Sequence, residues 1–145
     1  MMGRRWTGKV VVAGSAEGPA LVSAEPLSLW GGLDPRTGEI IDRRHDLSGA
    51  VVTGCVLVVP GGRGSSTGSA VLLESLRAGT APAGIVNLRT DPIAALGAIV
   101  ADVLYGRSLP IVVLPKEAFD SIRPGDRVAI EPDGTVRVGA EKPET

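Results

Sequence analysis

The chain has 145 residues and a 43% share of hydrophobic residues, which is enough apolar material for the core of one compact domain. Its 15 basic and 16 acidic residues leave a formal net charge of −1, so no long-range field favours a polyanion or an anionic membrane surface. No apolar run reaches the length of a membrane span. We therefore expect a cytoplasmic protein with no nucleic-acid or membrane partner, forming a single domain over residues 1–145.

The first half of the chain predicts strands separated by a long ordered loop. Residues 6–15 and 20–23 have the pattern of two short strands joined by a turn. The glycine and proline pairs in residues 27–41 favour an ordered loop or hairpin. Residues 54–60 form a β-branched run, which is typical of a strand buried on both faces.

The second half alternates helices and strands. The folded core of the domain is expected to extend from about residue 6 to residue 138, and a disordered tail is expected from residue 141. Together these patterns predict a mixed α/β domain. The expected elements are a helix over 69–77 ending at Gly79, a strand over 83–88, a helix from Asp91 and Pro92 to about Tyr105, a strand over 109–114, a helical turn around Phe119, and a hairpin of 128–131 with 135–138.

Residues 61–69, which we call the serine loop, join the buried strand to a helix. A strand, a glycine-rich turn and a helix bring several backbone N–H groups and the positive end of a helix dipole to one point. The hydroxyl groups of Ser65, Ser66, Thr67 and Ser69 add uncharged hydrogen-bond donors. The loop therefore predicts a site for a carboxylate or phosphate, with a plain helix cap as the structural alternative.

Better-known motifs fit this loop less well. A phosphate-binding P-loop needs a lysine that the loop lacks, and the third glycine of the dinucleotide fingerprint is replaced by Thr67. Residues 64–68 match the hydrolase pattern Gly-x-Ser-x-Gly, but that triad needs a histidine after the serine, and His45 precedes it. Arg63 could pair with a ligand carboxylate or anchor the loop.

The chain has one cysteine and one histidine, which cannot supply the usual ligands of a transition metal or iron–sulfur cluster alone. Cys55 lies in an apolar run, so we expect a buried small hydrophobic side chain there. His45 lies in the charged run 42–46, where a solvated loop or a subunit-contact surface is the simplest expectation.

Three segments, residues 26–35, 40–45 and 60–69, resemble the small subunit, or swivel domain, of the aconitase X family, as does 79–83 before a strand. The resemblance extends over about residues 6–138. It implies a swivelling β/β/α domain, with a small barrel flanked by helices, that closes over a larger cysteine-bearing subunit. Family members dehydrate small hydroxy acids: cis-3-hydroxy-L-proline in bacterial enzymes and a phosphorylated mevalonate in archaeal ones.

The resemblance also implies roles for the serine loop. The serine after Gly-Arg-Gly is the proton acceptor of the family, which is Ser65 here. From the chemistry of the loop itself, we expect Arg63, Gly64, Ser66 and Thr67 to bind the substrate. A serine is a poor base unless its alkoxide is stabilised, and convergent N–H groups at a helix start provide such stabilisation. The family's iron–sulfur cluster or iron is held by large-subunit cysteines, so this chain would bind no cofactor and be inactive alone.

The Gly-Gly-Arg-Gly-Ser-Ser-Thr form of the loop is closer to the hydroxyproline branch, with the phosphomevalonate branch as the alternative. Two other classes remain open. A swivelling phosphohistidine carrier would need a histidine where this loop has serines. An interaction module without chemistry would use the loop only as a capped helix start.

Overall fold

The computed structural model describes residues 3–139, in which the chain forms eight strands and three helices. The predicted tail from residue 141 lies outside the described residues. The elements in chain order are β1 (Arg4–Thr7), β2 (Lys9–Val12), β3 (Ala16–Val22), β4 (Val56–Val58), α1 (Gly68–Ala78), β5 (Gly84–Asn87), α2 (Pro92–Tyr105), β6 (Ile111–Val113), α3 (Lys116–Ser121), β7 (Arg127–Ile130) and β8 (Thr135–Gly139).

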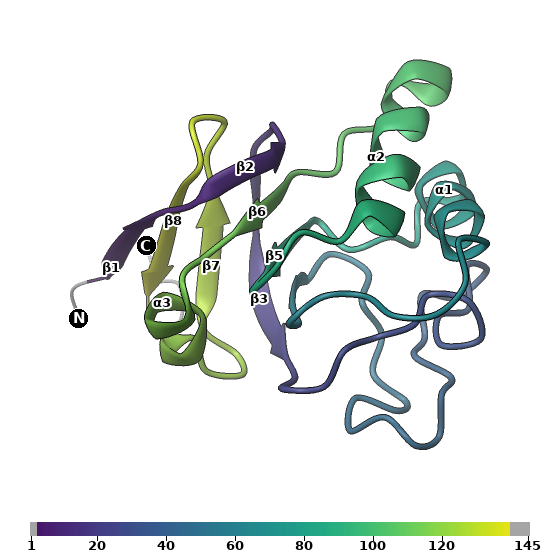
Figure 1. The fold of residues 1–145 in the computed structure, drawn as a ribbon, viewed down its shortest axis with the longest axis horizontal. Coiled ribbons are helices and arrows are strands. Elements are labelled where there is room, and N and C mark those ends of the chain that lie inside the picture. The colour runs from purple at the N-terminus through teal and green to yellow at the C-terminus, as the bar shows by residue number, and fades with distance from the viewer. Residues whose placement is uncertain (1–2, 140–145) are drawn as a thin grey trace, which may run out of the picture.

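The strands form one sheet in the order β1-β8-β7-β3-β4-β5-β6-β2. Strands β3, β4, β5 and β6 are parallel, and the remaining pairs are antiparallel. The two ends of this order, β1 and β2, are consecutive in the chain and separated only by Gly8, so the sheet nearly closes into a barrel. Figure 1 shows α1 and α2 together on one side of the strands, with α3 near β7 on the other.

Two apolar clusters fill the molecule. Alternate residues of a strand point to opposite faces, so Val56 and Val58 belong to the cluster inside the barrel, which Phe119 of α3 also joins. Leu57 and Val59 belong to the second cluster, which packs under α1 and α2. Strand β4 is therefore buried on both faces, and the residues that follow it emerge beside the helices.

The predicted α/β class with a small barrel flanked by helices is confirmed by this arrangement. The prediction for the N-terminus was wrong in two respects. Residues 6–15 do not form one strand, because the chain changes partner at Gly8: β1 pairs with β8 and β2 pairs with β6. The second strand also begins earlier than predicted, at Ala16, because residues 16–19 pair with β7.

The predicted helices are confirmed. Asp91 caps α2 by accepting hydrogen bonds from the N–H groups of Ile93 (3.0 Å) and Ala94 (3.3 Å). Helix α1 ends at Gly79, which adopts the left-handed conformation at the C-cap. None of the helices within residues 3–139 has the length and apolar character needed to cross a membrane.

Candidate functional site

The serine loop lies at the carboxyl edge of the parallel strands, between β4 and α1. Strands β4 and β5 pair in parallel, so the segments that follow them leave the sheet at the same edge. The side-chain amide of Asn87, at the end of β5, donates to the carbonyl of Val59 (2.9 Å), and the N–H of Leu88 donates to the carbonyl of Pro60 (2.9 Å). These bonds fix the start of the loop.

Hydrogen bonds with Thr67 hold Ser65 at the N-terminus of α1. The N–H of Thr67 donates to Ser65 Oγ (3.1 Å), and the Ser65 hydroxyl donates to Thr67 Oγ1 (3.0 Å). The carbonyl of Ser65 accepts from the N–H of Gly68 (3.0 Å), the first residue of the helix. The Ser65 side chain is thus oriented, although the residue remains exposed to solvent.

Several polar groups of the loop point to no partner in the protein. Within residues 3–139, no hydrogen bond is formed by the N–H groups of Gly64, Ser65 and Ser66, by the Ser66 hydroxyl or by the Arg63 guanidinium. All four residues are exposed. The structure therefore brings all the predicted site residues together on one exposed loop, with donors available at the positive end of α1.

A second segment, residues 27–30, packs alongside the loop. Leu27 forms a parallel bridge with Gly62, and its N–H donates to the carbonyl of Gly61 (3.2 Å). Gly64 has a φ of +96°, and a Cβ there would lie 2.6 Å from Ser28 Oγ, so only glycine fits this turn. The Ser28 hydroxyl in turn donates to the carbonyl of Trp30 (2.9 Å), whose side chain is 58% exposed.

Ser69 differs from the other hydroxyl residues of the loop. Its hydroxyl donates to the carbonyl of Ile93 (2.7 Å) and ties the first turn of α1 to the first turn of α2. The sequence predicted this hydroxyl as a further donor for a ligand, which was wrong. The structure instead uses it to join the two helices.

Sequence reasoning missed Arg89, which reaches the loop from the connection between β5 and α2. Its Nε lies 3.3 Å and its Cζ 3.4 Å from the position that a Cβ on Gly61 would occupy. A usable signal was present in the sequence, because ligand-binding residues of parallel sheets follow the carboxyl ends of neighbouring strands. Arg89 comes directly after the strand predicted at 83–88.

The charged run 42–46 was predicted to be a solvated loop or a subunit-contact surface, and Arg43, Arg44 and Asp46 are indeed exposed, but His45 is not. Its side chain is buried, with the residue 4% exposed. Its Nδ1 accepts from the N–H of Leu47 (3.1 Å), and its Nε2 lies 3.3 Å from the carbonyl oxygen of Glu25. Both ring nitrogens therefore hold backbone groups, and His45 joins the 42–48 turn to the 23–25 segment.

Cys55 is partly exposed rather than buried as predicted. Its Sγ lies 3.7 Å from the carbonyl oxygen of Val51, and partial burial raises the pKa of the thiol. In the described part of the chain, no three His, Cys, Asp or Glu side chains are grouped so that they could hold a metal ion.

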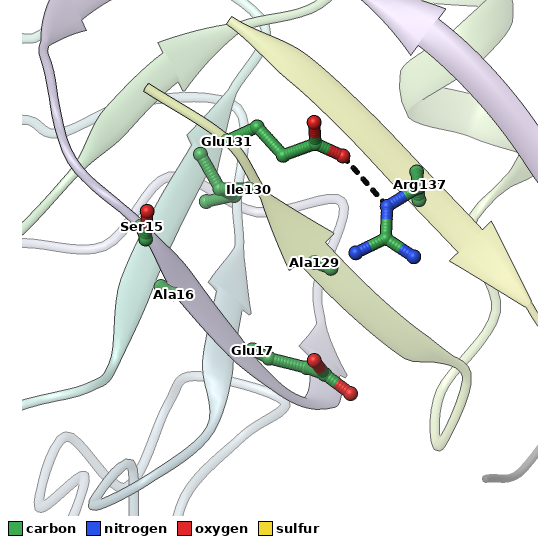
Figure 2. A pocket seen from close by; sticks show the side chains of 7 residues that line it. All are labelled: Ser15, Ala16, Glu17, Ala129, Ile130, Glu131 and Arg137. Atoms are coloured by element: carbon green, nitrogen blue, oxygen red, sulfur yellow. Dashed lines mark hydrogen bonds and ion pairs between the residues drawn. The ribbon is translucent and has the colours of Figure 1, made fainter. Parts of the chain in front are cut away.

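A pocket of about 350 Å³ lies elsewhere, between the start of β3 and strands β7 and β8. Figure 2 shows its lining, in which Glu131 pairs with Arg137 at 2.7 Å. Glu17, also in the lining, pairs with Arg127 at 2.9 Å. None of its lining residues belongs to the serine loop, and its charged groups are matched within the protein. We therefore place the candidate site at the loop.

Comparison with known proteins agrees with the resemblance to swivel domains. A family model described as the aconitase X swivel domain matches residues 5–138. A cis-3-hydroxy-L-proline dehydratase of Pseudomonas aeruginosa is 50% identical over 137 residues, which cover 93% of this chain and 23% of that protein. The chain thus spans about a quarter of the length of this relative.

Two further relatives are similar along nearly their whole length. A phosphomevalonate dehydratase small subunit of Methanothrix thermoacetophila is 40% identical, with 88% of this chain and 95% of that protein covered. A chain of the crystal structure of Thermococcus kodakaraensis aconitase X in its holo-form superposes with a TM-score of 0.83 and 34% identity, covering 93% of this chain and 98% of that one. The chain therefore belongs to the aconitase X family, as a swivel domain.

Proposed function

We propose that this chain is the swivel part of an aconitase X-type dehydratase that removes water from cis-3-hydroxy-L-proline together with a larger, cysteine-bearing part. The proposal is supported by 50% identity to a protein of that activity over most of the chain. The chain alone is inactive in this proposal. A small hydroxy acid would bind between the serine loop and the larger part.

The observation that carries the proposal is the environment of Ser65 Oγ. The N–H of Thr67 donates to this oxygen (3.1 Å) at the positive end of α1. Thr67 Oγ1 accepts from the Ser65 hydroxyl (3.0 Å), and its own hydroxyl hydrogen would turn to donate once Ser65 has lost its proton. These groups would stabilise a Ser65 alkoxide, because fixed donors and the helix dipole act on the charge where it develops. Ser65 is the residue of the loop best suited to accept a proton.

In the proposed reaction, Ser65 Oγ acts as the alkoxide and takes the proton from the carbon that bears the carboxylate. The electron pair of that C–H bond forms the double bond, and hydroxide leaves the neighbouring carbon. The same proton then passes to the departing hydroxide, which leaves as water and restores the alkoxide. Gly64 and Ser66 contribute backbone N–H groups, and Arg63, Ser66 and Thr67 contribute side chains, for binding the substrate on this chain. Departure of the hydroxide needs assistance from groups outside this chain.

An iron–sulfur cluster or iron centre belongs to the larger part in this proposal. The described residues of this chain offer no ligand set for it. Cys55 is apart from the serine loop in the fold, and the ring nitrogens of His45 are both engaged by backbone groups. We therefore assign to this chain proton transfer and substrate binding, and no metal ligand.

Phosphomevalonate is the second candidate substrate. It is favoured by the match in length, because the chain covers 95% of a phosphomevalonate dehydratase small subunit. The loop donors and Arg63 would suit a phosphate as well as a carboxylate. Phosphomevalonate ranks below cis-3-hydroxy-L-proline because that relative is only 40% identical to this chain.

The test is to purify the chain with its cysteine-bearing partner and to assay both hydroxy acids by proton NMR. We expect loss of the C2 proton and formation of the dehydrated product from cis-3-hydroxy-L-proline, and no turnover by either part alone. Turnover of phosphomevalonate instead would establish the second candidate. A complex that dehydrates neither compound would refute the proposed function.

A further inference from the structure

The serine loop has a second guanidinium beside it, that of Arg89, to which the family resemblance assigned no role. Its side chain is exposed and lies against Gly61, with Nε 3.3 Å and Cζ 3.4 Å from the Cβ position of that glycine. The glycine leaves room for the guanidinium across the start of the loop. A larger residue at 61 would push it away.

The backbone of Arg89 is fixed independently of its side chain. Its N–H donates to the carbonyl of Pro60 (3.1 Å), as does the N–H of the preceding Leu88 (2.9 Å). Two residues further on, Asp91 starts α2. Arg89 is therefore held at both sides in a short connection and projects toward the loop from a rigid position.

The guanidinium of Arg89 has no internal counter-ion. Among residues 3–139, no carboxylate forms an ion pair with it and no carbonyl accepts a hydrogen bond from it. The acidic group nearest in sequence, Asp91, forms no ion pair with Arg89, and its Oδ1 accepts from the N–H groups of Ile93 and Ala94. An arginine that only anchored the loop would use its donors on the loop, and Arg89 does not.

We propose that Arg89, which lies against Gly61 at the start of the serine loop, binds the carboxylate of the hydroxy-acid substrate. This inference rests on the proposed function, in which a partner covers the loop. Covering an unpaired guanidinium removes it from water, which is costly unless an anion accompanies it. The planar fork of arginine matches a carboxylate through two parallel hydrogen bonds.

Binding at Arg89 would fix the orientation of the substrate relative to the base. The proton to be removed is on the carbon that carries the carboxylate, so a clamp on the carboxylate limits where this proton can lie. Arg63, which projects from the loop itself, remains available for the rest of the substrate or for the alkoxide.

The test uses the complete dehydratase complex with Arg89→Met, Arg89→Lys and the control Arg107→Met. Arg107 is also exposed and has no ion pair in the described part of the chain, but it follows the far end of α2. For Arg89→Met we expect the KM for cis-3-hydroxy-L-proline to rise about 10- to 100-fold, the range for loss of a hydrogen bond to a charged group. Arg89→Lys should recover part of this loss, and Arg107→Met should stay within about twofold of the wild type.

Two readouts separate carboxylate binding from other roles. Inhibition by L-proline should weaken in Arg89→Met, whereas inhibition by L-prolinamide, which lacks the carboxylate, should not change. The dissociation constant between the two parts should not rise in Arg89→Met. An unaltered KM in Arg89→Met would overturn the inference. If the KM is unaltered and assembly is weaker, Arg89 binds the partner and not the substrate. A wild-type complex without dehydratase activity would instead refute the proposed function, and this inference with it.

Discussion

Asp91 links the serine loop to helix α2. Its carboxylate caps α2 through the N–H groups of Ile93 and Ala94, and its side chain also packs against Gly62 of the loop. The residue is buried, so its oxygens have little access to water. A change at Asp91 therefore affects a helix start and the loop backbone together.

We predict that Asp91→Ala lowers the free energy of unfolding by about 1 kcal/mol, the usual contribution of an N-cap side chain. Asp91→Asn should retain most of the stability, because its amide oxygen can still accept both hydrogen bonds. Urea denaturation of the isolated chain measures the difference. Equal stability of the alanine variant and the wild type would contradict the assigned cap.

The individual residues of the site were predictable to different degrees. The sequence places Ser65, Ser66 and Thr67 on one loop because they are consecutive and follow a glycine turn, and their roles in the site stay predictions. Arg89 was missed because its proximity to the loop depends on the parallel pairing of β4 with β5, which is a non-local contact. His45 was misplaced for the same kind of reason, since its partners include a carbonyl twenty residues earlier in the chain.

At the scale of elements, α1 and α2 meet through a close contact at Gly97. A Cβ on this residue would lie 2.8 Å from the carbonyl oxygen of Ser69 and 3.2 Å from the Cβ of Leu72. The absence of a side chain lets the first turn of α1 approach α2. The serine loop ends in that same turn, so helix packing sets the position of the loop.

We predict that Gly97→Ala destabilises the chain by about 1–3 kcal/mol, as expected for overpacking of a tight contact. Without a close contact, the same substitution would stabilise the helix, because alanine has a higher helix propensity than glycine by about 1 kcal/mol. The sign of the change in stability therefore distinguishes the two cases. The control Leu96→Ala, at a half-exposed neighbouring position, should change stability by no more than about 0.5 kcal/mol. A more stable Gly97→Ala variant would show that the two helices are not in close contact.

Local signals predicted the helices well. Asp91 with Pro92 marks the start of α2, and Gly79 marks the end of α1. The division of the N-terminal segment at Gly8 could not be predicted in this way. Strand β1 pairs with β8 from the opposite end of the chain, and β2 pairs with β6, so only the closed sheet determines where one strand stops and the next begins.

At the scale of the whole molecule, one apolar cluster lies inside the barrel and a second lies under α1 and α2. The serine loop connects strand β4 to helix α1. The loop residues from Arg63 to Thr67 are all exposed. A site built on this loop is open on the side away from the protein. This geometry agrees with the proposal that a partner completes the site.

The most direct test of the proposed mechanism is Ser65→Ala in the complex with the cysteine-bearing partner, with Ser48→Ala as a control at an exposed serine outside the loop. Turnover of cis-3-hydroxy-L-proline and the dissociation constant of the complex are measured together. We predict that Ser65→Ala lowers kcat by about 10²- to 10⁴-fold, the usual contribution of a positioned general base, while assembly and the control remain unchanged. Full turnover by the Ser65→Ala complex would contradict the assignment of Ser65 as the proton acceptor.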